Sequence, residues 1–111
     1  MIRESQTAVI VRNELWQGRL ATEPYEAGWA HEALVFVTAL KDGAGAAGIA
    51  HVEISPDGMR WAREGTTFTL PTRKDAVTFA KLAHFGNWLR LAVEMPADSE
   101  LKALVTVHAK A

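Results

Sequence analysis

Histidines are the residues of this sequence best suited to metal binding or proton transfer, and they occur as His31, His51, His84 and His108. His51 and Glu53 are two residues apart, so on a β-strand both side chains would point to the same face. Zinc needs three or four converging ligands, and no two histidines have a spacing such as His-x-x-x-His on a helix. We therefore expect solvated polar side chains at these positions and predict no metal site.

Carboxylates and hydroxyls are the other groups that could perform catalysis. Glutamates are scattered singly, mostly beside turns or on polar strand faces: Glu23, Glu26, Glu32, Glu53, Glu64 and Glu94. No Gly-x-Ser-x-Gly motif is present, and the glycine-rich residues 42–48 lack the Lys-Ser or Lys-Thr ending of a phosphate-binding loop. The sequence thus predicts no enzyme and no cofactor. A small barrel-type hydrolase or isomerase that uses His51, Glu53 or His108 is the third-ranked alternative.

Aromatic residues point to binding instead. Trp88 falls on the same side of a predicted strand as Arg90, and both residue types are enriched at the centres of protein interfaces. The alternative is that a loop of the chain itself covers Trp88. Tyr25 and Trp29 belong to the irregular segment 21–32, which either carries function or only covers one end of the fold. With outward-facing Leu104 on the last strand, these are the five residues that we predict to contact a partner.

Composition restricts the class of function. The 111 residues carry 12 basic and 13 acidic side chains, so the excess of positive charge expected of a nucleic-acid-binding protein is missing. There is no cysteine, which excludes disulfides and thiolate chemistry. The apolar run 8–11 is too short for a signal peptide, and no segment approaches the length of a membrane span. We expect one domain over residues 1–111, cytoplasmic at synthesis, that binds neither nucleic acid nor membrane.

The elements that must position these residues are short β-strands. Turn residues recur at short intervals, which leaves no room for helices of ten or more residues: Gly18, Pro24, Gly28, residues 42–45 and 56–58, Gly65, Pro71, residues 86–87 and 96–98. In 49–55, 88–95 and 101–110, apolar residues alternate with polar ones, as in antiparallel sheets with one solvated face. The sequence therefore predicts an all-β, jelly-roll-like antiparallel sandwich of about seven or eight strands.

Residues 33–40 differ because they are apolar on both faces. We predict a central strand covered on both sides, with a buried helix as the alternative. Residues 55–61, Ser-Pro-Asp-Gly-Met-Arg-Trp, predict a β-hairpin whose Trp61 enters the core beside Met59. Further strands are expected over 7–12, 14–22, 59–63, 66–70 and 76–82, the last of which also suits a short helix.

The hairpin and the later segment 85–91, Phe-Gly-Asn-Trp-Leu-Arg-Leu, together resemble small jelly-roll or sandwich modules of phage and particle structural proteins and of carbohydrate-binding modules. The resemblance covers about a third of the chain and transfers no functional residue. We expect a non-catalytic structural module that self-associates or packs onto a larger protein assembly, as a virion- or particle-type component. A carbohydrate-binding module that uses exposed aromatics is the second alternative, with a glycan as its ligand.

Overall fold

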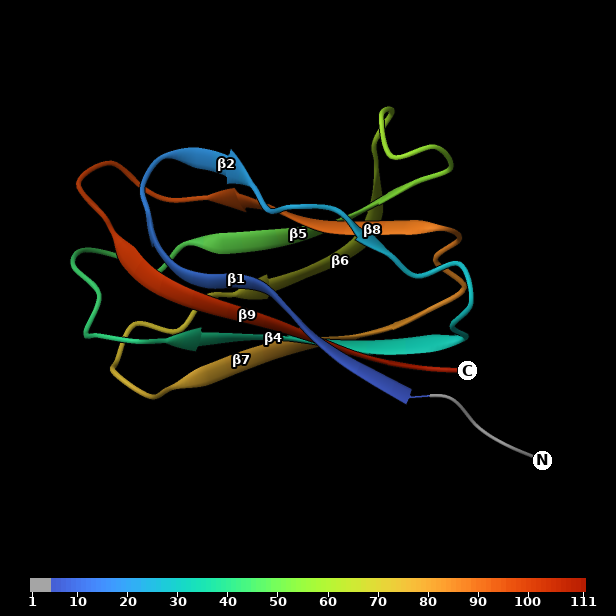
Figure 1. Cartoon of the computed structure of the whole chain (residues 1–111). Helices are drawn as coiled ribbons and strands as arrows, with labels where there is room; N and C mark the ends of the chain where they lie inside the picture. The colour runs from blue at the N-terminus through green and yellow to red at the C-terminus, as the bar shows by residue number, and fades with distance from the viewer. Residues whose placement is uncertain (1–4) are drawn as a thin grey trace.

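The computed structural model describes residues 5–111, which form nine β-strands arranged in two layers (Figure 1). The strands are β1 (Ser5–Trp16), β2 (Arg19–Ala21), β3 (Tyr25–Glu26), β4 (Glu32–Ala39), β5 (Ile49–Ser55), β6 (Ala62–Thr69), β7 (Val77–Ala83), β8 (Trp88–Glu94) and β9 (Leu101–Lys110). One sheet has the order β1-β9-β4-β7. The other has the order β2-β8-β5-β6. Strand β3 also pairs with β8, at the start of β8, whereas β2 pairs with its end.

The strand order is that of a jelly roll. All ladders are antiparallel, and they are nested: β5 pairs with β6 and β4 with β7, while β2 pairs with β8 and β1 with β9. Two further ladders, β4 with β9 and β5 with β8, join the nested halves into the two sheets. The predicted all-β antiparallel sandwich is therefore confirmed. Nine strands form in residues 5–111 instead of about seven or eight, because β2 and β3, of three and two residues, both form at the edge of β8.

The core lies between the sheets and takes every second residue of the long strands. On β8 the buried residues are Leu89, Leu91 and Val93, and on β9 they run from Leu101 to Ala109 in steps of two. The predicted alternation of these two strands is therefore confirmed. Trp16, at the end of β1, is one of the largest fully buried side chains.

Strand β4 is central in its sheet, as predicted, but only one of its faces is covered. Ala33, Val35, Val37 and Ala39 are buried in the core, whereas the alternating residues that begin at Leu34 are half-buried on the outer surface. The prediction of cover on both sides was wrong, because no element formed by residues 5–111 packs over the outside of this sheet. The alternative of a buried helix was wrong as well.

The region from β5 to β7 corrects three further predictions. The β5–β6 hairpin forms, but Met59 is 83% exposed and Trp61 is half-buried in the connecting loop, so neither enters the core. Gly65 does not end a strand: it adopts a φ of 113° inside β6, where the β5–β6 register shifts. Residues 77–83 form strand β7, so the helical alternative for this segment was wrong.

Candidate interaction surface

The outer surface of the β1-β9-β4-β7 sheet is built of aligned rows of side chains. Phe36 on β4 is flanked by Phe79 of β7 and Thr106 of β9. Leu34 is flanked in the same way by Lys81 and His108, and Thr38 by Val77 and Leu104. Paired residues of an antiparallel ladder share a face, so these rows stand side by side on one surface.

We call this surface the apolar face and define it by six residues: Val9, Leu34, Phe36, Val77, Phe79 and Leu104. Val77 and Phe79 are each 49% exposed and Val9 is 41% exposed. The Phe36 ring lies with its centroid 5.7 Å from that of Phe79 and 5.0 Å from that of His108, the latter in an edge-on arrangement. The result is an aromatic and aliphatic patch that extends over all four strands of the sheet.

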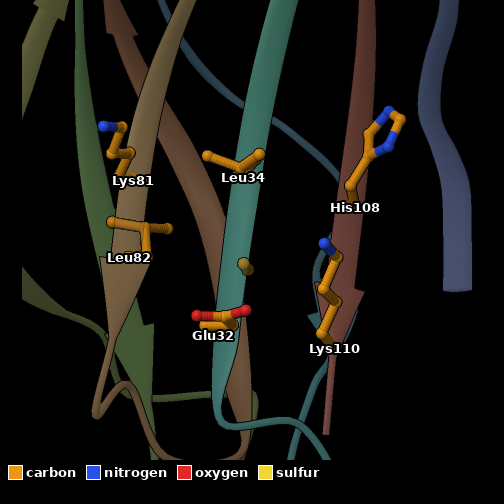
Figure 2. Close-up of a pocket in the computed structure, with 7 residues that line it drawn as sticks. Glu32, Leu34, Lys81, Leu82, His108 and Lys110 are labelled. Atoms are coloured by element: carbon orange, nitrogen blue, oxygen red, sulfur yellow. The ribbon is translucent and has the colours of Figure 1, made fainter. Parts of the chain in front are cut away.

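A hollow of about 160 Å³ opens on the same sheet, one row away from Phe36. Figure 2 shows that its lining side chains come from three neighbouring strands, β7, β4 and β9. They are Glu32, Ala33, Leu34, Lys81, Leu82, His108 and Lys110. Polar and charged groups thus surround an apolar centre, the arrangement that protein interfaces show between rim and core.

The outer surface of the other sheet has a different chemistry, and we call it the charged face: His51, Glu53, Arg63, Arg90 and Glu94, with Trp61 beside them. Arg90 Nε donates a hydrogen bond of 2.7 Å to Glu53 Oε1, and the Arg90 guanidinium lies 4.2 Å from the centre of the Trp61 ring. Arg63 donates to Glu94 at 3.2 Å. This hydrogen bond, together with the nearby charges of His51, Arg19 and Arg63, lowers the pKa of Glu94 below its ordinary value.

The β5–β6 loop covers Trp88, which lies at the end of the charged face. Gly58 has a φ of 78°, and a Cβ atom placed on it would lie 3.3 Å from the Trp88 ring. Asp57 holds the loop by accepting hydrogen bonds from the backbone N–H groups of Met59 and Arg60, which lower the pKa of its carboxyl. Trp88 is therefore half-buried beneath its own chain, the alternative that the sequence had left open.

The five residues predicted to contact a partner do not gather in one place. Trp88 and Arg90 lie on the outer side of β8, whereas Leu104 lies on the apolar face of the opposite sheet. Tyr25 and Trp29 pack against the core. The Tyr25 hydroxyl donates to Gln6 Oε1 at 3.4 Å, and burial, with a smaller effect from Glu26, raises its pKa.

Sequence reasoning missed most of the apolar face. The sequence points to only one of its six residues, Leu104, because it predicts a strand covered on both sides over residues 33–40. Phe79 and Val77 were overlooked because their segment also suited a helix. The signal that could have found the face is that residues 33–40 and 77–79 are apolar at outward positions on adjacent strands.

Of the four histidines, His31 and His84 line one hollow, whereas His51 and His108 do not converge. His51 lies on β5 and His108 on β9, in different sheets, and His51 Nε2 is 3.7 Å from Glu94 Oε2, beyond hydrogen-bonding distance. Within residues 5–111 no three side chains of His, Asp and Glu are grouped so that they could hold a metal ion. The same residues contain no helix of the length and apolar character needed to cross a bilayer.

Comparison with known proteins gave one informative match. No model of a known protein family matches the chain, and no curated protein does. Among solved structures, the SPBc2 prophage-derived protein YomS is similar, with a TM-score of 0.63 over 100% of this chain and 96% of that one, at 6% sequence identity. At this identity the likeness concerns the fold alone, so the chain shares the fold of a prophage-derived β-protein.

Proposed function

We propose that this protein is a non-catalytic structural module that self-associates or packs onto a larger protein assembly, and that the apolar face is its contact surface. One observation carries the proposal: Val77, Phe79 and Val9 are 41 to 49% exposed on a sheet whose outer side no element of residues 5–111 covers. Exposed apolar patches bounded by polar residues mark sites of protein contact.

The sequence of β4 supports this role. A strand that is apolar on both faces is typical of sheets covered on both sides, and β4 has only one side covered within its own chain. Covering the second side would remove Leu34 and Phe36 from water, at about 25 cal/mol per Å² of apolar surface. The net charge of -1 offers little electrostatic resistance to association.

The shared fold with a prophage-derived protein supports the narrower proposal of a virion- or particle-type component. The carbohydrate-binding alternative has weaker support, because the aromatics that would form its platform are separated. Trp88 lies beneath Gly58, and Tyr25 and Trp29 pack against the core.

The test is the solution mass by light scattering after size exclusion, over a wide concentration range. We expect a multiple of 12.1 kDa for the unchanged chain and a shift towards monomer for Val77→Ser. Ile49→Ser is the matched control, since Ile49 is 45% exposed but lies on the outer side of the other sheet. A strict monomer at all concentrations would overturn self-association, and equal loss in both variants would overturn the assignment of the face.

A further inference from the structure

We propose that the occupant of the apolar face is a second copy of this chain, packed sheet against sheet about a two-fold axis that runs across the strands. The inference rests on the proposed function and specifies its partner and geometry. In an isologous contact the same patch is used twice, so each feature must meet its complement on the same surface.

The apolar face carries such a complementary pair. Phe36 stands on β4, and the hollow around Leu34 lies two residues further along the same strand, about 7 Å away. A two-fold axis between these rows places Phe36 of each copy over the hollow of the other. The volume of about 160 Å³ suits the ring, since a protein cavity of roughly 150 Å³ accommodates benzene.

The order of the rows selects the direction of the axis. An axis along the strands would leave each row opposite the same row of the second copy, so the hollow would face the hollow and Phe36 would face Phe36. An axis across the strands reverses the rows. It separates Lys110 of the two copies and brings Glu32 of each copy towards Lys102 of the other. Lys81, in the row of Leu34, stays close to the axis.

The edge strands of this sheet favour association through the apolar face over the addition of a strand from a second copy. The edge strand β1 has register shifts between Val9 and Val11 and between Val11 and Glu14, which interrupt the regular row of backbone groups that a new strand would need. The opposite edge strand, β7, carries Lys81, and lysine on an edge opposes strand addition. The apolar face has no comparable obstacle.

The absence of cysteine allows a direct test, because each introduced thiol is unique. Three single variants of the full chain, Thr106→Cys, Lys102→Cys and Thr67→Cys, are treated with a bis-maleimide whose spacer spans about 10 Å, the distance between packed sheets. Thr106 lies in the row of Phe36, next to the proposed axis. Lys102 of the two copies would lie roughly 30 Å apart, and Thr67 lies on the outer side of the other sheet. The solution mass of each variant is measured first.

We expect covalent dimers from Thr106→Cys and none from the other two variants. Cross-linking of Lys102→Cys would overturn the axis across the strands, and cross-linking of Thr67→Cys would overturn the choice of face. A dimeric mass without any cross-linking of Thr106→Cys would overturn this geometry while leaving self-association intact. A monomeric mass for the unchanged chain would instead overturn self-association itself, so the two failures are distinguishable.

Discussion

The two outer faces of the sandwich are built on equivalent strands yet differ in chemistry. Strand β8 lies inside its sheet between β2 and β5, and β4 lies inside the other sheet between β9 and β7. Both strands bury alternate apolar side chains in the same core. Outward, β8 presents Trp88, Arg90 and Glu94, whereas β4 presents Leu34 and Phe36.

The two faces differ in the partners that their outward side chains find within the chain. All ion pairs formed by residues 5–111 lie on the charged face or in the β5–β6 loop. On that face Arg90 contacts both the Glu53 carboxylate and the Trp61 ring, whereas His51 Nε2 is buried without a hydrogen-bond partner. On the apolar face the side chains have only each other, and further burial would come from another molecule.

The substitution with the largest expected effect tests whether assembly depends on the apolar face and not on the charged face. Phe36→Ser removes the side chain that we place in the hollow of the second copy, and each dimer loses it twice. We expect the dissociation constant of the assembly to rise roughly 1,000-fold, since a central aromatic contributes about 2 kcal/mol per copy and the dimer loses two. Sedimentation equilibrium measures the change. Trp61→Ser on the charged face is the control, and an equal loss of assembly there would contradict the comparison.

The second prediction concerns stability on the charged face. Arg90→Met leaves the Glu53 carboxylate, which is 14% exposed, without its partner. We expect the free energy of unfolding to fall by about 1–3 kcal/mol, with assembly retained. Arg60→Met is the control, because the exposed Arg60–Asp57 pair at 3.5 Å contributes less than about 1 kcal/mol. Chemical denaturation measures both changes, and equal losses would show that the burial of the Arg90 pair is unimportant.

The third prediction concerns the contact between Gly58 and the Trp88 ring. Gly58→Ala and Gly86→Ala both place a Cβ at positive φ, of 78° and 74°, which costs about 1–2 kcal/mol. Only at Gly58 does the new atom also meet the Trp88 ring, whereas around Gly86 nothing lies within 4 Å. We expect Gly58→Ala to be the more destabilising of the two by up to about 1 kcal/mol and to shift the tryptophan fluorescence. Identical stabilities and spectra would argue against the contact.

The smallest expected effect is a pH dependence of the charged face. Arg63 holds the pKa of Glu94 below 4.5, so the stability from this pair is present above that pH and is lost as the pH falls through the lowered value. We expect the unfolding free energy of Arg63→Met to decline less steeply in acid than that of the unchanged chain. Denaturation at a series of pH values tests this, with Lys81→Met on the apolar face as the control. If the unfolding free energy of Arg63→Met declined with acid as steeply as that of the unchanged chain, the Arg63–Glu94 pair would not contribute to the pH dependence.

The local elements were predictable because their signals are local. The alternation of 88–95 and 101–110 assigns inward and outward residues correctly, since a strand repeats every two residues. The hairpin at 55–61 follows from Pro-Asp-Gly chemistry and forms as expected. Trp61 was misplaced because its cover depends on Arg90, which is distant in sequence and adjacent in space.

By itself, the sequence determined the fold class, the inner faces of β8 and β9 and the absence of cysteine chemistry, because composition and period-two patterns act within a few residues. Only the tertiary structure decided which apolar side chains stay uncovered. Whether Phe36 is buried depends on whether a third layer lies over β4, and a pattern along one strand carries no information about that layer. The nested ladders place β4, β7 and β9 side by side, and this placement turns separate apolar residues into one surface.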